Sequence, residues 1–416
     1  MRLRVPGLLL ITTLAAAAAA LAAPMPPGVV GNGVQDDTAA IQQALDNAGK
    51  TGGEVFLPAG QYVISGSLNV PTGVTLRGSW EAPHHGAYQK GSTLLITGGR
   101  GREDGPAAVE LKQSSAIRGF TMVWPEETSD NIVPYPWAIH GVGMYNTVED
   151  VTFINAYQGI KIGQPFSEIH LIRNVFGCVL RRGIFIDTTS DIGRIENVHF
   201  NPDQWQRSGH PSYIQGKGDV ARYMQDNLEA FIFGRTDWEY VLNTFVYAAK
   251  IAYHFIATPS GTCNGQFSGI GADGCRTCVQ IDKIQPIGIQ VTNGEFTSFV
   301  GDPNTAILTS PGANGAAQFV NCNFWANTGH VAWMQGDTEV TMSSCHIVNV
   351  AKGGAILADA GKLIVQGCNF SQAGPAIIIG AGVKSAVIMG NLQTGGVQIQ
   401  NGIGAHAHIG LNETAP

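Results

Sequence analysis

Three polar residues lie within or directly after short apolar strand motifs at separate places in the chain. Lys161 lies in Gly-Ile-Lys-Ile, Asp187 ends Gly-Ile-Phe-Ile-Asp, and His254 lies in Ile-Ala-Tyr-His. Successive side chains of a strand point to opposite faces, so Lys161 faces outward if Ile160 and Ile162 face inward. The same alternation leaves Asp187 and His254 outside. If the strands stack, we expect these three side chains to line one groove, with Lys161 and His254 binding the ligand.

A second group of polar and aromatic residues lies between residues 201 and about 244, where the apolar motif is interrupted. We interpret this stretch as an insertion that overhangs the groove and contains a helix from Asp219 to Phe233. Sugar rings have an apolar face and a hydroxylated edge, so aromatic rings beside carboxylates and arginines suit them. The substrate-binding candidates, together with Arg181 before the Asp187 strand, are Trp205, Arg207, His210 and Trp238. The alternative interpretation is a helix docked by its aromatic residues and ringed by surface salt bridges.

Two reactions fit such a groove. Glycosidic hydrolysis needs one protonated and one charged carboxyl group, which Asp187 with Asp237 or Glu239 could supply. Elimination of a uronic acid needs a base and cations that neutralise the sugar carboxylate, and here Arg181, Arg182, Lys161 and His254 are the candidates. We favour hydrolysis, with Arg182 as a further catalytic candidate.

Neither reaction demands a cofactor, and no metal site is expected. If the reaction is elimination, Asp187 and Asp191 could in addition bind a calcium ion. A non-catalytic carbohydrate-binding or adhesive protein remains a third alternative, because a fold does not dictate a function.

The groove requires strands that repeat at a fixed interval. Two apolar motifs alternate along the chain with a common period of about 20–25 residues, and Cys322, Cys345 and Cys368 are each 23 residues apart in the second motif. A strand of four or five residues cannot bury its inner face alone, so each period predicts one coil of a solenoid. We expect residues 139, 160, 184 and 251 to align along its axis.

The residues before the second inward-facing strand of each coil are of the types that tolerate a positive φ: Asp150, Asn174, Asn197, Asn321, Ser344 and Gly367. We therefore expect a stacked turn at this corner of the solenoid. At the N-terminal end, Asp36-Asp37-Thr38 followed by Ile41, Leu45 and Ala48 predicts a capping helix over about 37–49.

The first residues predict an export signal. Arg2 and Arg4 precede an apolar run from Leu8 to Leu21 that ends in small residues, so we expect residues 1–23 to be removed and residues 24–416 to form one domain. The run is too short for a membrane span. Removal of two arginines makes the net charge of −7 more negative, which argues against a nucleic-acid partner. We expect a secreted, periplasmic or cell-surface protein.

Seven cysteines suit an exported protein but cannot all pair. Stacked Cys322, Cys345 and Cys368 would form either a disulfide or a ladder of buried thiols. In the Gly-rich segment, a disulfide from Cys263 to Cys275 or Cys278 is favoured over zinc. We interpret Cys178 as buried and free.

The N-terminal motifs carry a family resemblance. Gly31-Asn-Gly-Val-Gln-Asp-Asp-Thr-Ala-Ala-Ile41, Glu54-Val-Phe-Leu-Pro-Ala-Gly60 and Gly73-Val-Thr-Leu-Arg-Gly78 resemble the pectate-lyase-like superfamily, and more narrowly the rhamnogalacturonase or epimerase-like group related to family 28 glycoside hydrolases. The resemblance implies an all-β, single-stranded right-handed parallel β-helix and activity on a pectin-like or other polysaccharide or oligosaccharide. The catalytic motifs of family 28 are absent, and we interpret Asp36 and Asp37 as structural.

Overall fold

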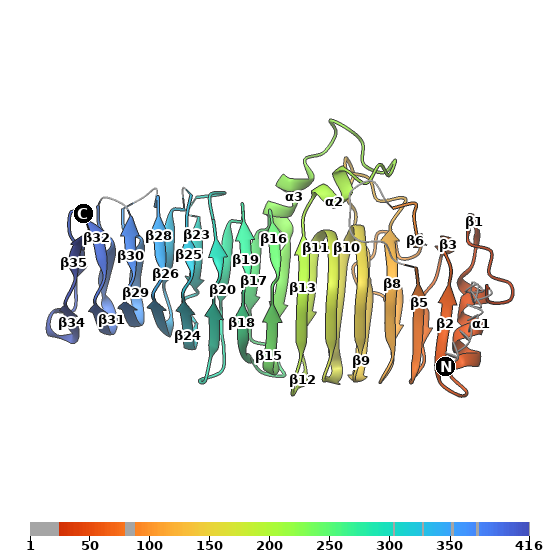
Figure 1. Cartoon of the computed structure of the whole chain (residues 1–416), viewed down its shortest axis with the longest axis horizontal. Helices are drawn as coiled ribbons and strands as arrows, with labels where there is room; N and C mark the ends of the chain where they lie inside the picture. The colour runs from red at the N-terminus through yellow and green to blue at the C-terminus, as the bar shows by residue number, and fades with distance from the viewer. Residues whose placement is uncertain are drawn as a thin grey trace, which may run out of the picture.

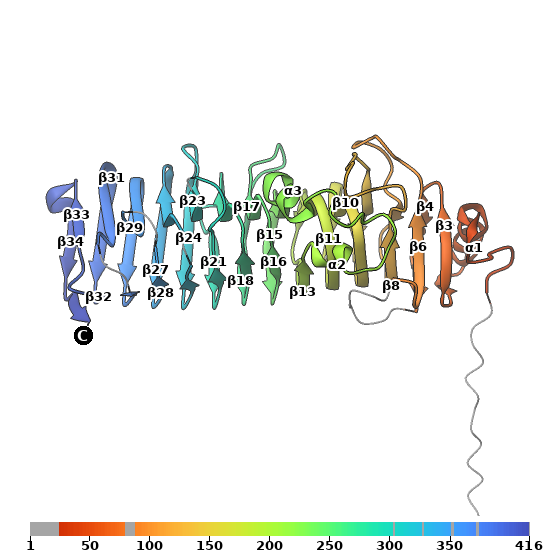
Figure 2. The same cartoon turned by 90° about the horizontal axis from the view of Figure 1, so that it is seen from above.

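The computed structural model describes residues 25–79, 88–302, 304–326, 328–350, 353–371 and 374–415. The chain winds through about 15 turns of a right-handed parallel β-helix, as expected. Figures 1 and 2 show the coils stacked along the long axis, with helix α1 (Thr38–Ala48) at one end and the C-terminal strands at the other. No helix within the described part of the chain has the length and apolar character to cross a membrane. The predicted export signal, residues 1–23, lies outside the described residues.

Each coil contributes to three parallel sheets. The first, called the site sheet below, contains the last residues of β10 and β11, the first of β29 and β31, and β4 (Leu68–Val70), β7 (Val109–Leu111), β9 (Trp137–Met144), β14 (Glu229–Phe233), β17 (Ile251–Phe255), β20 (Thr277–Ile281), β23 (Thr305–Thr309), β26 (His330–Met334) and β33 (Ile399–Asn401). The long strands turn a corner between sheets: β8 (Ala116–Val123), β10 (Thr147–Glu168), β11 (Leu171–Ile186), β13 (Arg194–Phe200), β29 (Ile356–Gln366) and β31 (Ile377–Met389).

The other two sheets close the coil. The second sheet adds β2 (Gly53–Leu57), β5 (Val74–Gly78), β15 (Thr236–Leu242), β18 (Cys263–Ser268), β21 (Ile289–Thr292), β24 (Asn314–Val320), β27 (Asp337–Ser343) and β34 (Ala407–Gly410). The third sheet adds β1 (Asn32–Asp36), β3 (Gly60–Ile64), β6 (Ser92–Ile96), β16 (Phe245–Tyr247), β19 (Gly271–Asp273), β22 (Glu295–Phe296), β25 (Asn323–Phe324), β28 (His346–Val348), β30 (Asn369–Ser371), β32 (Leu392–Thr394) and β35 (Glu413–Ala415). The two-residue strand β12 (Thr189–Ser190) pairs with the end of β10.

The predicted vertical alignment is confirmed for three of its four residues. Ile139, Ile160 and Ile184 are register partners on successive coils and are fully buried. The prediction for residue 251 was wrong. An unexpected coil, which contains β14, follows β11, and Phe231 of β14 and Tyr253 of β17 continue this inward column. Ile251 instead pairs with the first residue of β14.

The stacked turn is confirmed. Asp150, Asn174 and Asn197 have φ values of 55°, 54° and 53°, and the same holds for Asn321, Ser344 and Gly367. The amides bond along the stack: Asn174 Nδ2 donates to Asp150 Oδ1 at 2.9 Å, and Asn197 Nδ2 donates to Asn174 Oδ1 at 2.8 Å.

The N-terminal helix is also confirmed, with Ile41 and Leu45 buried against the first coil. Its predicted cap differs in detail. The Asp37 carboxylate makes no bond to the helix; it accepts from the amides of Val30 and Gly31 at 2.7 and 3.1 Å. Asp37 therefore ties the preceding loop to the helix start, which agrees with the structural role expected for it.

The insertion is shorter than predicted. Only residues 201–228 leave the coil, with α2 (Asp203–Gln206) and α3 (Val220–Asn227) protruding beside β10 and β11 (Figure 1). The helix expected from Asp219 to Phe233 ends at Asn227, and the residues that follow form β14. β14 and β15 pair with strands of the neighbouring coils, which places them in the solenoid wall instead of above the groove.

All seven cysteines are buried and free, as expected for Cys178. The disulfide predicted from Cys263 is therefore wrong. The Cys275 and Cys278 thiols lie 3.5 and 3.4 Å from the backbone carbonyls of Asp273 and Thr297. Cys322, Cys345 and Cys368 form the buried thiol ladder that was one of the two alternatives.

Candidate functional site

One pocket on the outer face of the site sheet contains two of the residues predicted from the sequence. Its volume is about 300 Å³, and its lining residues are Asp104, Trp137, Lys161, Gln164, Arg182, Phe185, Glu229, Ile232 and Ile256. Lys161, Phe185 and Ile232 are register partners on three successive coils, so they form one outward row. His254 continues this row on the next coil.

Lys161 supplies an amine to the pocket. Burial lowers the pKa of its amine, and the positive charge of Arg182 acts in the same direction, while Asp187 and Glu110 oppose the shift. Within the described residues the amine has no hydrogen-bonded or ion-paired partner. A partly desolvated, unpaired amine can lose its proton more readily than an exposed lysine and act as a base.

Arg182 lines the pocket together with this amine, and Arg181 precedes it in β11. Arg182 Nη1 donates to Gln158 Oε1 at 3.1 Å and pairs with Glu103 at 3.3 Å. Arg181 Nη1 pairs with Glu229 Oε1 at 3.2 Å and donates to the carbonyl of Asn227 at the end of the insertion. These contacts fix the position of both guanidinium groups, and Arg182 remains at the pocket wall.

His254 lies between two carboxylates at the edge of the pocket. Its Nδ1 is 2.9 Å from Glu229 Oε2, and its Nε2 is 2.9 Å from Asp282 Oδ2. Burial opposes a charge on the ring, but the bonds to Asp282 and Glu229 outweigh it and raise the pKa of His254 to about 9. Burial likewise opposes the charge of both acids, yet the His254 bond lowers the pKa of Glu229 and of Asp282 to about 2. All three groups are therefore charged at neutral pH.

An aromatic platform completes the pocket. The rings of Trp137 and Phe185 are stacked, with centroids 6.3 Å apart and an interplanar angle of 23°. Trp137 and Arg182 are both register partners of the buried Gln158, and both line the pocket. A sugar ring lying on this platform would have its polar edge toward Lys161 and Arg182.

The carboxylates proposed for hydrolysis lie elsewhere. Asp187 is fully buried, and its Oδ1 accepts from Arg235 N and Thr258 Oγ1, both at 2.7 Å. Its Oδ2 accepts from the pocket residue Gln164 at 2.6 Å. The expectation that Asp187 faces the groove beside His254 was thus wrong: it lies beneath the surface, and β14 separates their coils. These donors occupy the positions that a calcium ion at Asp187 would need.

The other two carboxylates belong to β15 on the second sheet. Glu239 is fully buried and bonded to His170 Nε2 at 2.9 Å and Thr236 Oγ1 at 2.8 Å. Asp237 pairs with Arg235 at 2.5 Å and accepts from Gln285 at 2.6 Å. Neither lines the pocket.

The insertion residues are not assembled around the pocket either. Trp205 was expected to be a sugar platform, but it is fully buried, and its Nε1 donates to Ser212 Oγ at 2.9 Å. Burial lowers the pKa of His210 to about 4 and so keeps it neutral. Arg207 forms a surface pair with Asp203 at 3.1 Å. Trp238 is exposed, but on the second sheet. For most of these residues the docked-helix interpretation is the better one.

Several pocket residues were missed. Glu229 and Arg182 are register partners on β14 and β11. If β14 had been recognised as a strand of the solenoid, aligning it with the end of β11 would have placed Glu229 next to Arg182. Trp137 begins the strand that carries His140, and no pattern marked it. Asp104 belongs to the loop from 97 to 108, for which the repeat gives no signal. Among the described residues, no group of three or more His, Cys, Asp or Glu side chains could hold a metal ion.

Comparison with known proteins supports the N-terminal resemblance. Residues 27–103 match the family described as rhamnogalacturonase A/epimerase, pectate lyase-like. Mannuronan C5-epimerase AlgE5 of Azotobacter vinelandii is 60% identical over 40 residues, which are 9% of this chain and 4% of that enzyme. Its homologue AlgE3 is 42% identical over 72 residues, 17% of this chain and 3% of that enzyme. The matched part is thus a small fraction of these curated relatives.

Solved structures show the fold. Gene product 12 of bacteriophage phi29, in its pre-mature form, has a TM-score of 0.51 at 10% identity and covers 88% of this chain and 51% of that one. The A-module of mannuronan C-5 epimerase AlgE6 of Azotobacter vinelandii has a TM-score of 0.43 at 14% identity, covering 94% and 98%. The family 28 exopolygalacturonase of Yersinia enterocolitica has a TM-score of 0.42 at 11% identity, covering 92% and 75%. The chain is a right-handed parallel β-helix whose residues 27–103 are pectate lyase-like and match the rhamnogalacturonase A and epimerase family.

Proposed function

We propose that this protein is an exported enzyme that removes the proton beside the carboxylate of a uronic acid in a polysaccharide. The observation that carries the proposal is the unpaired, partly buried amine of Lys161 next to Arg182, in one pocket with the Trp137–Phe185 platform. A base and a cation in one pocket meet the two demands of the reaction: C5 loses its proton, and the neighbouring carboxylate must be neutralised as negative charge develops.

The steps follow from the groups present. The neutral Lys161 amine accepts the C5 proton, and Arg182 pairs with the sugar carboxylate. In elimination, the electrons of the C5–H bond form a C4–C5 double bond, the C4–O bond breaks with its electron pair on oxygen, and that oxygen takes up a proton from water. In epimerisation, water supplies a proton to C5 from the opposite face and the chain stays intact. In both reactions the Lys161 ammonium then returns its proton to solvent. The names of the matched relatives, mannuronan C5-epimerases, support this shared first step.

Hydrolysis receives less support from the same pocket. The carboxylates that line this pocket are Asp104 and Glu229. A glycosidase needs one carboxyl group that holds a proton. The low pKa of Glu229, about 2, keeps that residue ionised. Export is proposed from the signal expected at residues 1–23, and the partner is an acidic polysaccharide or oligosaccharide.

The decisive experiment supplies purified protein with polymannuronate, polyguluronate, polygalacturonate and neutral glycans. Absorbance of unsaturated uronates reports elimination, exchange of C5 hydrogen in deuterated water reports epimerisation, and reducing ends without either signal report hydrolysis. We expect Lys161→Gln to lower the rate at least about 100-fold, the usual contribution of a general base, at an unchanged melting temperature. The rate of the parent protein should rise with pH, because only the deprotonated amine is a base.

The matched control is Lys362→Gln, since Lys362 lies on the second sheet and forms a 3.5 Å surface pair with Glu339. Its activity should equal that of the parent protein. Full activity of Lys161→Gln would remove the proposal. Tight binding of a polyuronate without any product would identify a non-catalytic binding protein instead.

A further inference from the structure

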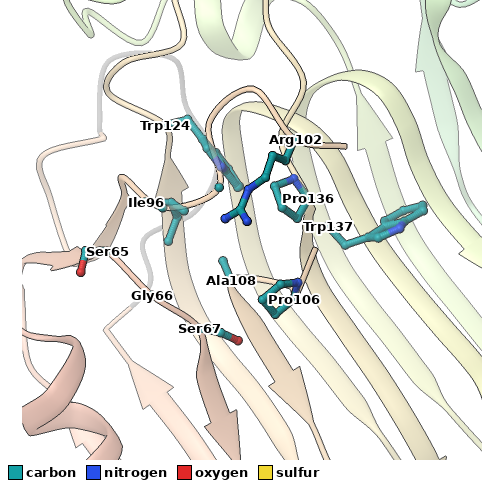
Figure 3. Close-up of a pocket in the computed structure, with 12 residues that line it drawn as sticks. Ser65, Gly66, Ser67, Ile96, Arg102, Pro106, Ala108, Trp124, Pro136 and Trp137 are labelled. Atoms are coloured by element: carbon teal, nitrogen blue, oxygen red, sulfur yellow. The ribbon is translucent and has the colours of Figure 1, made fainter. Parts of the chain in front are cut away.

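A second, smaller pocket adjoins the first at Trp137, which lines both. Its volume is about 80 Å³. Figure 3 shows the Arg102 side chain reaching down into it between Ile96 and Pro136, with Ala108 and Pro106 below and Trp124 above; the ring of Trp137 points away from it. The walls are therefore mostly apolar and the centre is cationic.

Arg102 is held by the backbone of its loop but not by any acid. Its amide donates to the carbonyl of Gly99 at 3.1 Å, and the adjacent Gly101 amide donates to Pro134 at 2.8 Å. In the described part of the chain its guanidinium has no carboxylate partner, whereas Arg100 pairs with Glu126 at 3.7 Å. An unpaired guanidinium beside apolar walls suits a planar carboxylate, which it can bind through two parallel hydrogen bonds.

The loop that carries Arg102 is also part of the first pocket. The next residue, Glu103, pairs with Arg182 at 3.3 Å, and its carbonyl accepts from Gln158 at 3.0 Å. Val109, Ile139 and Ile160 are register partners, so the strand after this loop lies two coils from that of Lys161. At the spacing of parallel strands this is about 10 Å along the axis. Because Trp137 lines both pockets, the two cationic sites are neighbours on the same face.

We propose that the Arg102 pocket binds the carboxylate of a second uronate unit of the chain whose first unit reacts at Lys161. The inference rests on the proposed function and narrows its substrate to polymers with more than one acidic unit within reach. Arg102 is a binding residue here: it determines specificity and takes no part in the proton transfer.

The test is calorimetric titration with an oligouronate hexamer and with its carboxyl-reduced, neutral counterpart. Loss of one charge-assisted contact should weaken binding of the acidic hexamer to Arg102→Gln about tenfold, and leave the neutral one unchanged. The control is Arg100→Gln. Arg100 lies two residues from Arg102, but its guanidinium already pairs with Glu126, so this variant should bind the acidic hexamer as the parent does. In activity assays, Arg102→Gln should raise KM and leave kcat nearly unchanged.

Each outcome separates the two proposals. Equal binding by Arg102→Gln and the parent would overturn the second site while leaving the reaction at Lys161 to its own assay. A tenfold loss with no product from any polyuronate would support the second site and contradict the reaction. An equal loss in Arg100→Gln, or preference of the parent for the neutral hexamer, would show that no specific carboxylate site exists at Arg102.

Discussion

A single histidine links three coils at the edge of the pocket. Glu229 begins β14, His254 lies on β17, and Asp282 follows β20, so the two bonds of the imidazole run along the axis of the solenoid. The single positive charge of the ring lies between the two carboxylates and reduces the repulsion between them. With Arg181 it holds Glu229 as an anion at the edge of the pocket.

This arrangement predicts a pH-dependent contribution to stability. The folded pKa of His254, about 9, is above the ordinary 6.5, so its charge stabilises the folded chain fully below pH 6.5 and is lost as pH rises toward 9. The difference corresponds to about 3 kcal/mol as an upper figure. His254→Gln should therefore lower the melting temperature strongly at pH 6 and little at pH 10.

The control for this prediction is His330→Gln. His330 lies on the same sheet, but its Nδ1 is bonded to the carbonyl of Gly354 at 2.9 Å. Its effect on the melting temperature should be alike at both pH values. A deficit for His254→Gln that is as large at pH 10 as at pH 6 would contradict the charged state of the ring.

The contrast between Lys161 and Asp187 marks what alternation can predict for single residues. Lys161 lies inside a strand, where the pleat decides the face, and its outward position was predictable. Asp187 follows the last residue of β11, and Thr188 after it has a φ of 55°. Because the chain bends there, the alternation no longer applies, and local hydrogen bonds to Gln164, Arg235 and Thr258 decide the direction of the side chain.

At the scale of elements, the stacked turn is the feature that keeps the coils in register. Asn197 adopts a φ of 53°, is exposed, and donates to Asn174 on the preceding coil. Asparagine tolerates this left-handed conformation, whereas a β-branched residue does not.

Asn197→Val should therefore lower the free energy of unfolding by about 1–2 kcal/mol, because the branched side chain is strained in the left-handed region. Asn197→Gly should be nearly neutral, since glycine adopts this φ freely and only one exposed hydrogen bond is lost. Urea denaturation followed by circular dichroism would measure both. Equal losses in the two variants would place the stabilisation in the side-chain amide and not in the backbone.

The insertion shows where prediction of elements failed. The segment after Leu228 contains residues that are common in both helices and strands, and a helix through Phe233 was predicted. Tertiary contacts decide otherwise: Phe231 stacks on Tyr253 of the next coil with centroids 4.9 Å apart and lies 5.5 Å from Phe200. Both partners are distant in the sequence, so the local preferences of the residues between Leu228 and Phe233 could not identify β14.

At the scale of the whole molecule, the core is a column and not a sphere. Each strand pairs with its neighbours in the stack, and a buried run of aromatic rings passes through β14, β17 and β18. Phe255 is fully buried there, 5.4 Å from Phe233 and 5.0 Å from Phe267 between ring centroids. In a linear stack, stability is a sum of coil and nearest-neighbour terms, so damage should spread only to adjacent coils.

Phe255→Ala tests this column directly. Removing the ring leaves a cavity that should cost about 3–5 kcal/mol locally, while Phe255→Leu, which retains most of the apolar volume, should cost less. Hydrogen exchange should accelerate in β14, β17 and β20, whose residues Phe233, Phe255 and Ile281 are register partners, and in β18. Strands β29 and β31 lie several coils away and should keep their protection, because no contact connects them to the cavity except through the intervening coils. Uniform acceleration over the described chain would mean that the solenoid unfolds as one cooperative unit, and the nearest-neighbour description of its stability would be wrong.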